Sequence, residues 1–271
     1  MSAVTNGGGL EPHQHGKLYW ALVDGWVLAK RNLVQIPRIP ELLVFAIIQP
    51  VMFVLLFRYV FGGAIDVGGE SYVNYLMAGI FVQTVAFGSV STGIGLSEDL
   101  HKGLVDRFRS LPMASSAVLT GRTIADLVRN LFVVLVMLIV GILVGFRPDA
   151  GIAGWAGAVG LLLLLSFSFS WIGATIALLL RSTEAVQSAG FIWLFPLTFA
   201  SSAFVMTNNM PGALKAFADH QPMTQVIDAV RGLLLDQPVG SHGWQALAWC
   251  LGILVIFIPL SVSLYRRVAT R

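Results

Sequence analysis

Residues 98–112, EDLHKGLVDRFRSLP, form the most charged stretch of a chain whose other long segments are apolar. Three acidic and three basic side chains lie within these residues, and a long hydrophobic run lies on each side. Apolar residues recur here at spacings of four, four and three, which places them on one helical face: Leu100, Leu104, Phe108 and Leu111. Pro112 lacks a backbone N–H and disfavours helical geometry at the residue before it, so the helix ends there. The stretch therefore predicts a short amphipathic helix between two hydrophobic segments.

The composition of the whole chain identifies it as a membrane protein. Of its 271 residues, 56% are hydrophobic and 11% are charged, and the mean hydropathy is +0.79. Soluble domains carry about 25% charged residues. A helix crosses the hydrocarbon core with about 20 residues. Six segments meet this length and predict an all-α integral membrane protein with spans at about 42–61, 73–97, 130–146, 153–180, 186–206 and 244–265.

The distribution of basic residues predicts the orientation of these spans, because cytoplasmic loops carry an excess of Lys and Arg. With both termini inside, the outer side holds four of the 17 Lys and Arg residues, namely Arg58, Arg147, Lys215 and Arg231. The other thirteen lie on the cytoplasmic side. The helix at 98–112 is therefore expected in the cytoplasm, either as a solvated loop or as a docking element for a partner.

The residues before the first span divide into two parts. Residues 1–16 have neither the basic nor the apolar region of a signal peptide and predict a disordered cytoplasmic tail. Residues 17–38 place Lys17, Asp24 and Arg31 on one helical stripe and carry Trp20 and Trp26 elsewhere. We expect an amphipathic helix lying in the inner membrane interface, rather than a seventh span.

No motif predicts catalysis or a metal site. The chain contains no phosphate-binding loop of the form G-x-x-x-x-G-K-[ST] and no hydrolase or zinc-protease motif. Its five histidines do not cluster, and its one cysteine, Cys250, lies in an apolar run. The second span is the most polar, with Gln83, Thr84 and Ser91 among its residues, so it should face protein or a water-filled path. These features predict a transporter that lacks its own ATP-hydrolysing machinery.

Two stretches resemble the membrane subunits of type-2 ABC exporters, in the daunorubicin-resistance branch. The first, EDLHKGLVDRFRSLPMASSAVLTGRTIADLVRN (98–130), carries the cytoplasmic signature of that family in Glu98, Gly103, Leu111-Pro112 and Gly121-Arg122. The second, MPGALKAFADHQPMTQVIDAVRGLLL (210–235), is similar to the outer-face segment that precedes the last span. Together with the six-span layout, the resemblance covers residues 17–268.

The resemblance implies a role for the charged helix. In this family the corresponding segment is a coupling helix, which sits in a groove of a separate ATP-binding subunit and transmits nucleotide-driven closure to the spans. It would include Glu98, Asp99, Lys102, Gly103, Leu104, Asp106, Arg107, Phe108, Arg109, Leu111 and Pro112. The apolar members would supply an anchor, and the charged members would fix the register.

The family also implies the domain layout and the partners. The interface helix covers 17–38 and the type-2 transmembrane domain covers 39–268. Within that domain, residues 207–243 form an outer-face element, with an ordinary outer loop as the alternative. The expected partners are two copies of an ATPase subunit and a second permease half, which would be another copy of this chain in a homodimer. Membrane lipids are expected to bind as well, and nucleic acid is not. No cofactor is expected in this chain, whereas ATP and Mg would bind the partner. The location would be the inner membrane of a bacterium.

Aromatic residues in spans two and five suggest where cargo passes. The candidate path comprises Phe81, Gln83, Phe87, Phe191, Trp193 and Phe195. The expected cargo is a hydrophobic or amphipathic compound, such as an anthracycline-like drug or a lipid. The alternatives are a self-sufficient secondary transporter or channel, an accessory anchor protein, and export of a polysaccharide or a lipid-linked glycan.

Overall fold

The structure is a computed structural model that describes residues 30, 40–65, 67, 71–102, 115–180 and 182–269. The part of the chain that it describes is helical and contains no strand. Its helices are α2 (Pro40–Leu55), the π-helix η2 (Leu56–Phe61), α3 (Tyr72–His101), α5 (Ser115–Val144), α6 (Ile152–Leu180), α7 (Thr183–Phe199), the 3-10 helix η3 (Thr207–Asn209), α8 (Gly212–His220), α9 (Pro222–Leu234) and α10 (His242–Ala269). The predicted all-α membrane fold is confirmed.

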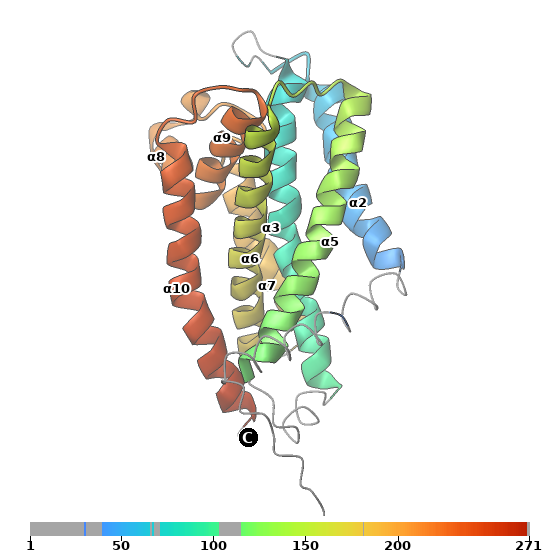
Figure 1. The fold of residues 1–271 in the computed structure, drawn as a ribbon, viewed down its shortest axis with the longest axis vertical. Coiled ribbons are helices and arrows are strands. Elements are labelled where there is room, and N and C mark those ends of the chain that lie inside the picture. The colour runs from blue at the N-terminus through green and yellow to red at the C-terminus, as the bar shows by residue number, and fades with distance from the viewer. Residues whose placement is uncertain are drawn as a thin grey trace, which may run out of the picture.

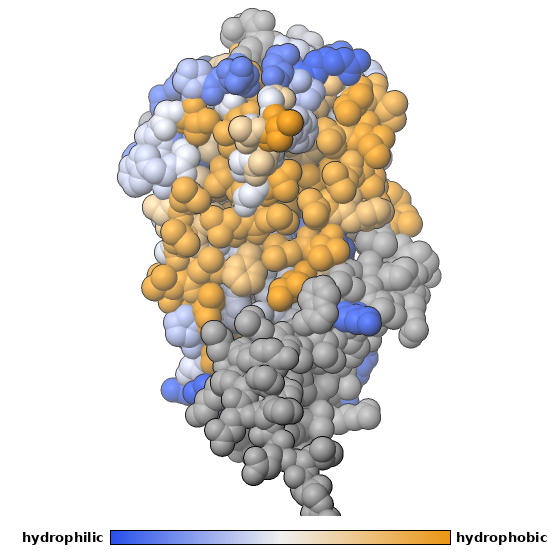
Figure 2. Space-filling model, viewed as in Figure 1, coloured by the Kyte–Doolittle hydropathy of each residue, from blue (hydrophilic) through white to orange (hydrophobic). Residues whose placement is uncertain are grey.

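The long helices run side by side along the long axis of the molecule, and α8 and α9 lie at one end of it (Figure 1). On the face shown in Figure 2, apolar residues form a broad area over the middle of the molecule, and polar residues gather at the end that carries α8 and α9. Five described helices, α2 with η2, α3, α5, α6 and α10, are long and apolar enough to cross a membrane. The chain is therefore a multi-pass membrane protein.

Helix α3 occupies the centre of the bundle. In the most apolar window of each helix, 83% of the residues of α3 are buried, against 11% for α2 and for α10. A Cβ atom at Gly173 of α6 would lie 2.3 Å from the backbone oxygen of Ser89, so glycine there lets α3 and α6 approach closely. Thr92 of α3 also donates to Ser170 of α6 at 3.2 Å. The expectation that the polar second span faces protein is confirmed.

Helix α7 is shorter than the span predicted at 186–206, because it has 17 residues and ends at Phe199. The following residues turn back into the bundle and are buried from Ser201 to Phe204. The backbone of Ala203 packs against Gly79 of α3, where a Cβ atom would lie 2.4 Å from the Ala203 oxygen. The helix ends inside the bundle because this irregular segment packs against α3. The described residues therefore contain five helices that are long enough to span a membrane, and α7 is a shorter sixth candidate.

Helix α5 begins earlier than the predicted third span, which was placed at 130–146. It starts at Ser115 and is continuous through Arg122, Asp126 and Arg129 to Val144. The prediction from hydropathy began the span after these charged residues, because their side chains are strongly hydrophilic. Asp126 and Arg129 lie one helical turn apart and form an ion pair at 3.3 Å, which permits their partial burial.

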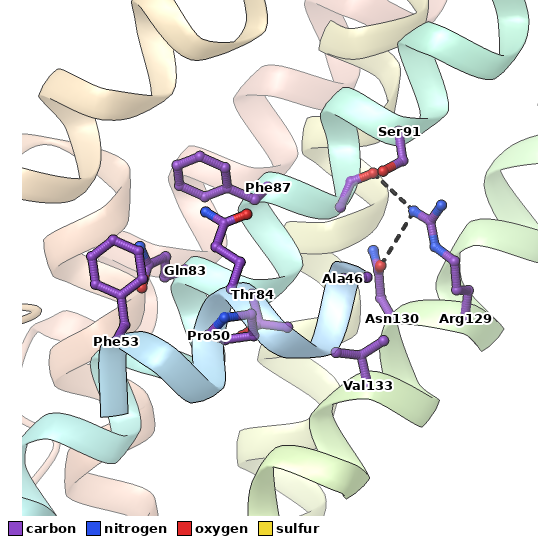
Figure 3. Close-up of a pocket in the computed structure, with 12 residues that line it drawn as sticks. Ala46, Pro50, Phe53, Gln83, Thr84, Phe87, Ser91, Arg129, Asn130 and Val133 are labelled. Atoms are coloured by element: carbon purple, nitrogen blue, oxygen red, sulfur yellow. Dashed lines mark hydrogen bonds between the residues drawn. The ribbon is translucent and has the colours of Figure 1, made fainter. Parts of the chain in front are cut away.

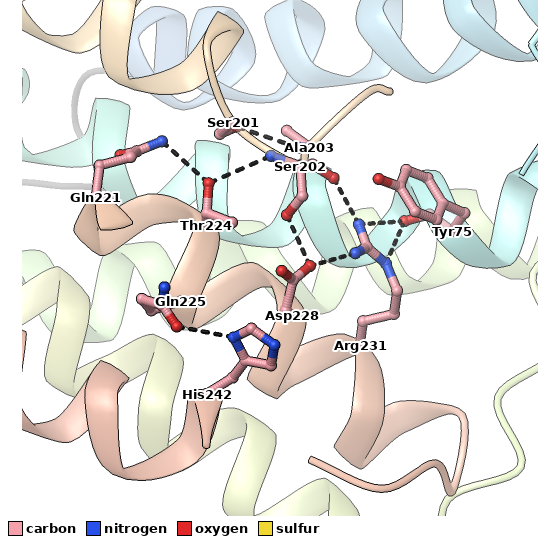
Figure 4. Close-up of polar contacts among 10 residues, drawn as sticks. All are labelled: Tyr75, Ser201, Ser202, Ala203, Gln221, Thr224, Gln225, Asp228, Arg231 and His242. Carbon is pink, nitrogen blue, oxygen red and sulfur yellow. Dashed lines mark hydrogen bonds and ion pairs between the residues drawn. The ribbon is translucent and has the colours of Figure 1, made fainter. Parts of the chain in front are cut away.

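Within the predicted outer-face element, α9 is packed into the bundle, whereas most of α8 is exposed. Most of α9 is buried, and Arg231 on it is the centre of a polar cluster (Figure 4). Its guanidinium pairs with Asp228 at 2.5 Å and donates to the Ser202 oxygen at 2.7 Å and to the Tyr75 oxygen at 3.3 Å. It also lies 3.7 Å from the centre of the Tyr75 ring. The cluster ties α9 to α3 and to the irregular segment after α7.

Candidate functional site

The end of α3 carries the part of the predicted coupling segment that the structure describes. Glu98 and Asp99 lie in the last turn of α3, and Lys102 follows it. Lys102 pairs with Glu98 at 3.2 Å, but both side chains are exposed, so this pair adds little stability. The other eight predicted residues, Gly103, Leu104, Asp106, Arg107, Phe108, Arg109, Leu111 and Pro112, lie outside the described residues, as does the predicted interface helix apart from Lys30.

An ion pair joins the two helices on either side of the predicted coupling segment. Arg122 Nη1 of α5 donates to Asp99 Oδ2 of α3 at 2.6 Å, and both side chains are mostly buried. A Cβ atom at Gly95 would lie 1.4 Å from Arg122 Nη2, so the glycine provides the space that the guanidinium occupies. Arg122 is the arginine of the Gly-Arg pair in the sequence motif. The end of α3 and the start of α5 are therefore held together.

The start of α7 has a defined helix cap. Ser182 Oγ accepts a hydrogen bond from the backbone N–H of Ala185 at 3.1 Å, which caps the helix. The pKa of the exposed Glu184 carboxyl lies below its usual value, chiefly because a backbone N–H donates to it, with smaller contributions from Ser182, Thr183 and the charge of His101.

A cleft lies between α2, α3 and α5 (Figure 3). Its lining comprises Ala46, Gln49, Pro50 and Phe53 of α2, Gln83, Thr84, Phe87, Gly88 and Ser91 of α3, and Arg129, Asn130 and Val133 of α5. The four residues from α2 are at positions i, i+3, i+4 and i+7, so they belong to one face of that helix. The cavity volume of the cleft is about 80 Å³, below the roughly 300–1,000 Å³ of small-molecule sites, so the cleft can hold only one part of a larger ligand.

Most polar groups at the α5 side of this cleft are paired within the protein. Asn130 donates to Ser166 Oγ at 2.7 Å, and Arg129 donates to the backbone oxygen of Gly88 at 3.0 Å. A Cβ atom at Gly88 would lie 2.4 Å from Asn130 Oδ1, so this glycine lets the amide reach α3. The charge of Arg129 is balanced by Asp126 at 3.3 Å. This side of the cleft is polar and close to neutral.

Aromatic rings of α3 and α7 continue from the cleft. The ring of Phe87 lies 5.9 Å from that of Phe191 and 5.7 Å from that of Phe195, which in turn stacks on Phe199 at 5.5 Å. Phe53 of α2 lies 6.1 Å from Phe199. The rings therefore form one connected group across three helices. Such surfaces suit flat apolar molecules.

The six residues of the predicted cargo path lie in two different surroundings. Gln83 and Phe87 line the cleft, and Phe191 and Phe195 contact Phe87. Two others do not line it, because Phe81 is buried against Phe146 and Trp193 packs on Phe169 at 5.1 Å. The sequence reasoning missed Phe53, Arg129 and Asn130. Arg129 and Asn130 could have been identified because they form a polar pair at the start of an apolar segment.

Comparison with known proteins identifies the family. The profile of the ABC-2 type transporter family matches residues 24–235. A daunorubicin resistance ABC transporter permease protein of Streptomyces coeruleorubidus is 36% identical over 88% of this chain and 84% of that protein. A probable doxorubicin resistance ABC transporter permease protein of Mycobacterium tuberculosis is 30% identical over 83% of this chain and 82% of its own length. A putative transport permease of Cyanophora paradoxa is 26% identical over 79% of this chain. The chain belongs to the ABC-2 type transporter family of membrane permeases.

Proposed function

We propose that this chain is the permease subunit of an ATP-driven exporter that moves hydrophobic or amphipathic compounds, such as anthracycline-like drugs, out of the cytoplasm. The observation that carries the proposal is the family match over residues 24–235, together with relatives named for daunorubicin and doxorubicin resistance. ABC permeases act with an ATPase. ATP and Mg would bind that separate subunit, and this chain would change conformation without making or breaking bonds.

The ATPase would dock on the segment 98–112. The ion pair between Asp99 and Arg122 supports this assignment, because it joins the helices that lead into and out of the segment. A push on the segment would then move α3 and α5 together. Since α3 is the central helix and lines the cleft, the movement would reach the cargo site.

A complete exporter would contain two copies of this chain and two ATPase subunits. Helix α3 is buried within one chain and has little surface left for a second copy, so the contact between the copies would be formed by α7 and α2. Helix α7 exposes Ile192, Phe195 and Phe199, and α2 exposes Phe45 and Met52.

The exporter would lie in the inner membrane of a bacterium, with both termini in the cytoplasm. The end of α10 carries Arg266 and Arg267, and it lies at the same end of the molecule as the start of α5 (Figure 1). Basic residues gather on the cytoplasmic side of membrane proteins. This distribution supports placing the Asp99–Arg122 pair on the cytoplasmic side.

The proposal is tested by purification and transport. The tagged chain, extracted from its own membrane in mild detergent, should retain an ABC ATPase in an equimolar ratio, measured by mass spectrometry. Inside-out vesicles should accumulate daunorubicin with ATP and Mg, and not with ADP. A chain that purifies alone and moves daunorubicin in vesicles without ATP would instead be a secondary transporter or channel.

Reversing one charge of the Asp99–Arg122 pair should impair transport while the ATPase stays bound. In Arg122→Asp two carboxylates would face each other, so the ends of α3 and α5 would separate. We expect ATP-driven uptake into vesicles to fall about fivefold, as for the loss of an ion pair of about 1 kcal/mol. The swapped pair Asp99→Arg with Arg122→Asp should recover most of the activity. Equal loss in the swapped protein would show that the attraction between the two charges is not what matters.

A further inference from the structure

Gln83 of α3 is a buried amide without a hydrogen-bonding partner. Its side chain is 2% exposed, and neither its Nε2 nor its Oε1 atom has a partner within the described part of the protein. Leaving a buried polar group unpaired costs about 1–3 kcal/mol, and more than 90% of such groups are paired in known proteins. Seven other buried side-chain atoms of the described residues also lack a partner, but Gln83 is the one amide among them, which makes it a candidate for contact with a ligand.

The other buried polar residue that lines the cleft, Asn130, shows the contrast. Asn130 donates to Ser166 and receives a contact from Arg129 at 3.5 Å. Thr84, next to Gln83, donates to the backbone oxygen of Ile80 at 2.7 Å. The fold thus satisfies the neighbours of Gln83 and leaves the donor and the acceptor of this amide unpaired in the wall of the cleft.

Aromatic surface lies at the same end of the cleft as Gln83. Figure 3 shows Phe53, Gln83 and Phe87 together at one end, and Ser91, Arg129 and Asn130 at the other. The first end therefore combines flat apolar surface with one free amide. The pairing of Arg129 with Asp126 leaves no unbalanced charge at the other end. Such a site suits a neutral polar group attached to an aromatic body.

We propose that Gln83 is the residue that selects cargo in this cleft, by hydrogen bonding to a hydroxyl or carbonyl group of an aromatic compound whose ring system packs against Phe53 and Phe87. This inference rests on the proposed function and narrows its substrate class. Recognition comes from the free amide, because a site built to hydrogen-bond a ligand discriminates against the analogue that lacks the polar group.

The test compares 1-pyrenebutanol with 1-butylpyrene, which share the aromatic body and differ by one hydroxyl group. Binding to the purified protein in lipid nanodiscs is measured by energy transfer from its tryptophans to pyrene, without ATP. In Gln83→Leu the Kd for 1-pyrenebutanol should rise about tenfold, whereas that for 1-butylpyrene should change less than twofold. Gln237→Leu, the same change at an exposed position between α9 and α10, should leave both values unchanged.

The thermal stability of Gln83→Leu separates recognition from a structural role. Because the amide is unpaired in the fold, its replacement by an apolar side chain should leave the melting temperature unchanged or raise it. A melting temperature several degrees lower would show that Gln83 supports the fold and would overturn the proposal. Equal affinities of Gln83→Leu and the unmodified protein for 1-pyrenebutanol would also overturn it. If ATP-driven export of daunorubicin persists in either case, the proposed function stands and the cargo-selecting role alone fails.

Discussion

Changing Leu104 and Phe108 together to Asp should remove nearly all of the ATPase that co-purifies with this chain. The two residues lie four apart on the apolar face of the predicted helix at 98–112. A carboxylate buried in an apolar groove loses its hydration without gaining a partner. Two central contact residues at about 2 kcal/mol each would raise the Kd of the complex about a thousandfold.

The experiment measures the molar ratio of ATPase to permease after tag purification, with size-exclusion chromatography to verify that the permease is folded. Leu214→Asp with Phe217→Asp provides the matched control, since these exposed residues lie on α8, at the opposite end of the molecule from the start of α5 (Figure 1). The control protein should retain the ATPase in full. An unchanged ratio in the Leu104 and Phe108 variant would place the ATPase contact elsewhere on the chain.

The apolar runs predicted most of the helices, because burial in lipid requires length and hydrophobicity, and a sequence displays both. The interior position of α3 was also predictable, since polar residues such as Gln83 and Thr92 avoid lipid. The end of α7 was not, because Ser201–Phe204 is irregular for a reason that lies in another helix. Gly79, more than 100 residues away, provides the space that the backbone of Ala203 fills.

The cleft shows the same limit. Gln83 and Phe87 were identified because they lie in one polar and aromatic segment. Arg129 was assigned to a cytoplasmic loop, because its charge suggested water. Its partners are Asp126 in its own helix and the Gly88 backbone in α3. A local pattern cannot reveal a partner that the tertiary fold supplies, and the contacts of Arg231 with Tyr75 and Ser202 could not be predicted for the same reason.

Replacing Arg231 by Met should destabilise the protein more than replacing an exposed arginine does. The guanidinium holds Asp228, the Ser202 oxygen and the Tyr75 oxygen, so it joins three segments that are distant in sequence. Removing one partner of a buried ion pair costs about 3–5 kcal/mol, because the other charge is left without compensation. Asp228 is partly exposed, so the lower figure applies here, which corresponds to a melting temperature about 6–12 °C lower.

Three variants, compared by thermal unfolding in detergent with size-exclusion detection, separate the causes of this loss. Asp228→Asn with Arg231→Met should recover part of the stability, since it removes the uncompensated charge but not the lost hydrogen bonds to Ser202 and Tyr75. Arg147→Met, at an exposed arginine that also donates to backbone oxygens, should change the free energy of unfolding by less than about 0.5 kcal/mol. If Arg231→Met unfolds at the temperature of the unmodified protein, the cluster does not hold α9 in the bundle. A further outcome is an equal loss of stability in Arg231→Met and in the double variant with Asp228→Asn. In that case the loss comes from the hydrogen bonds and the ring contact of Arg231, and water compensates the charge of Asp228.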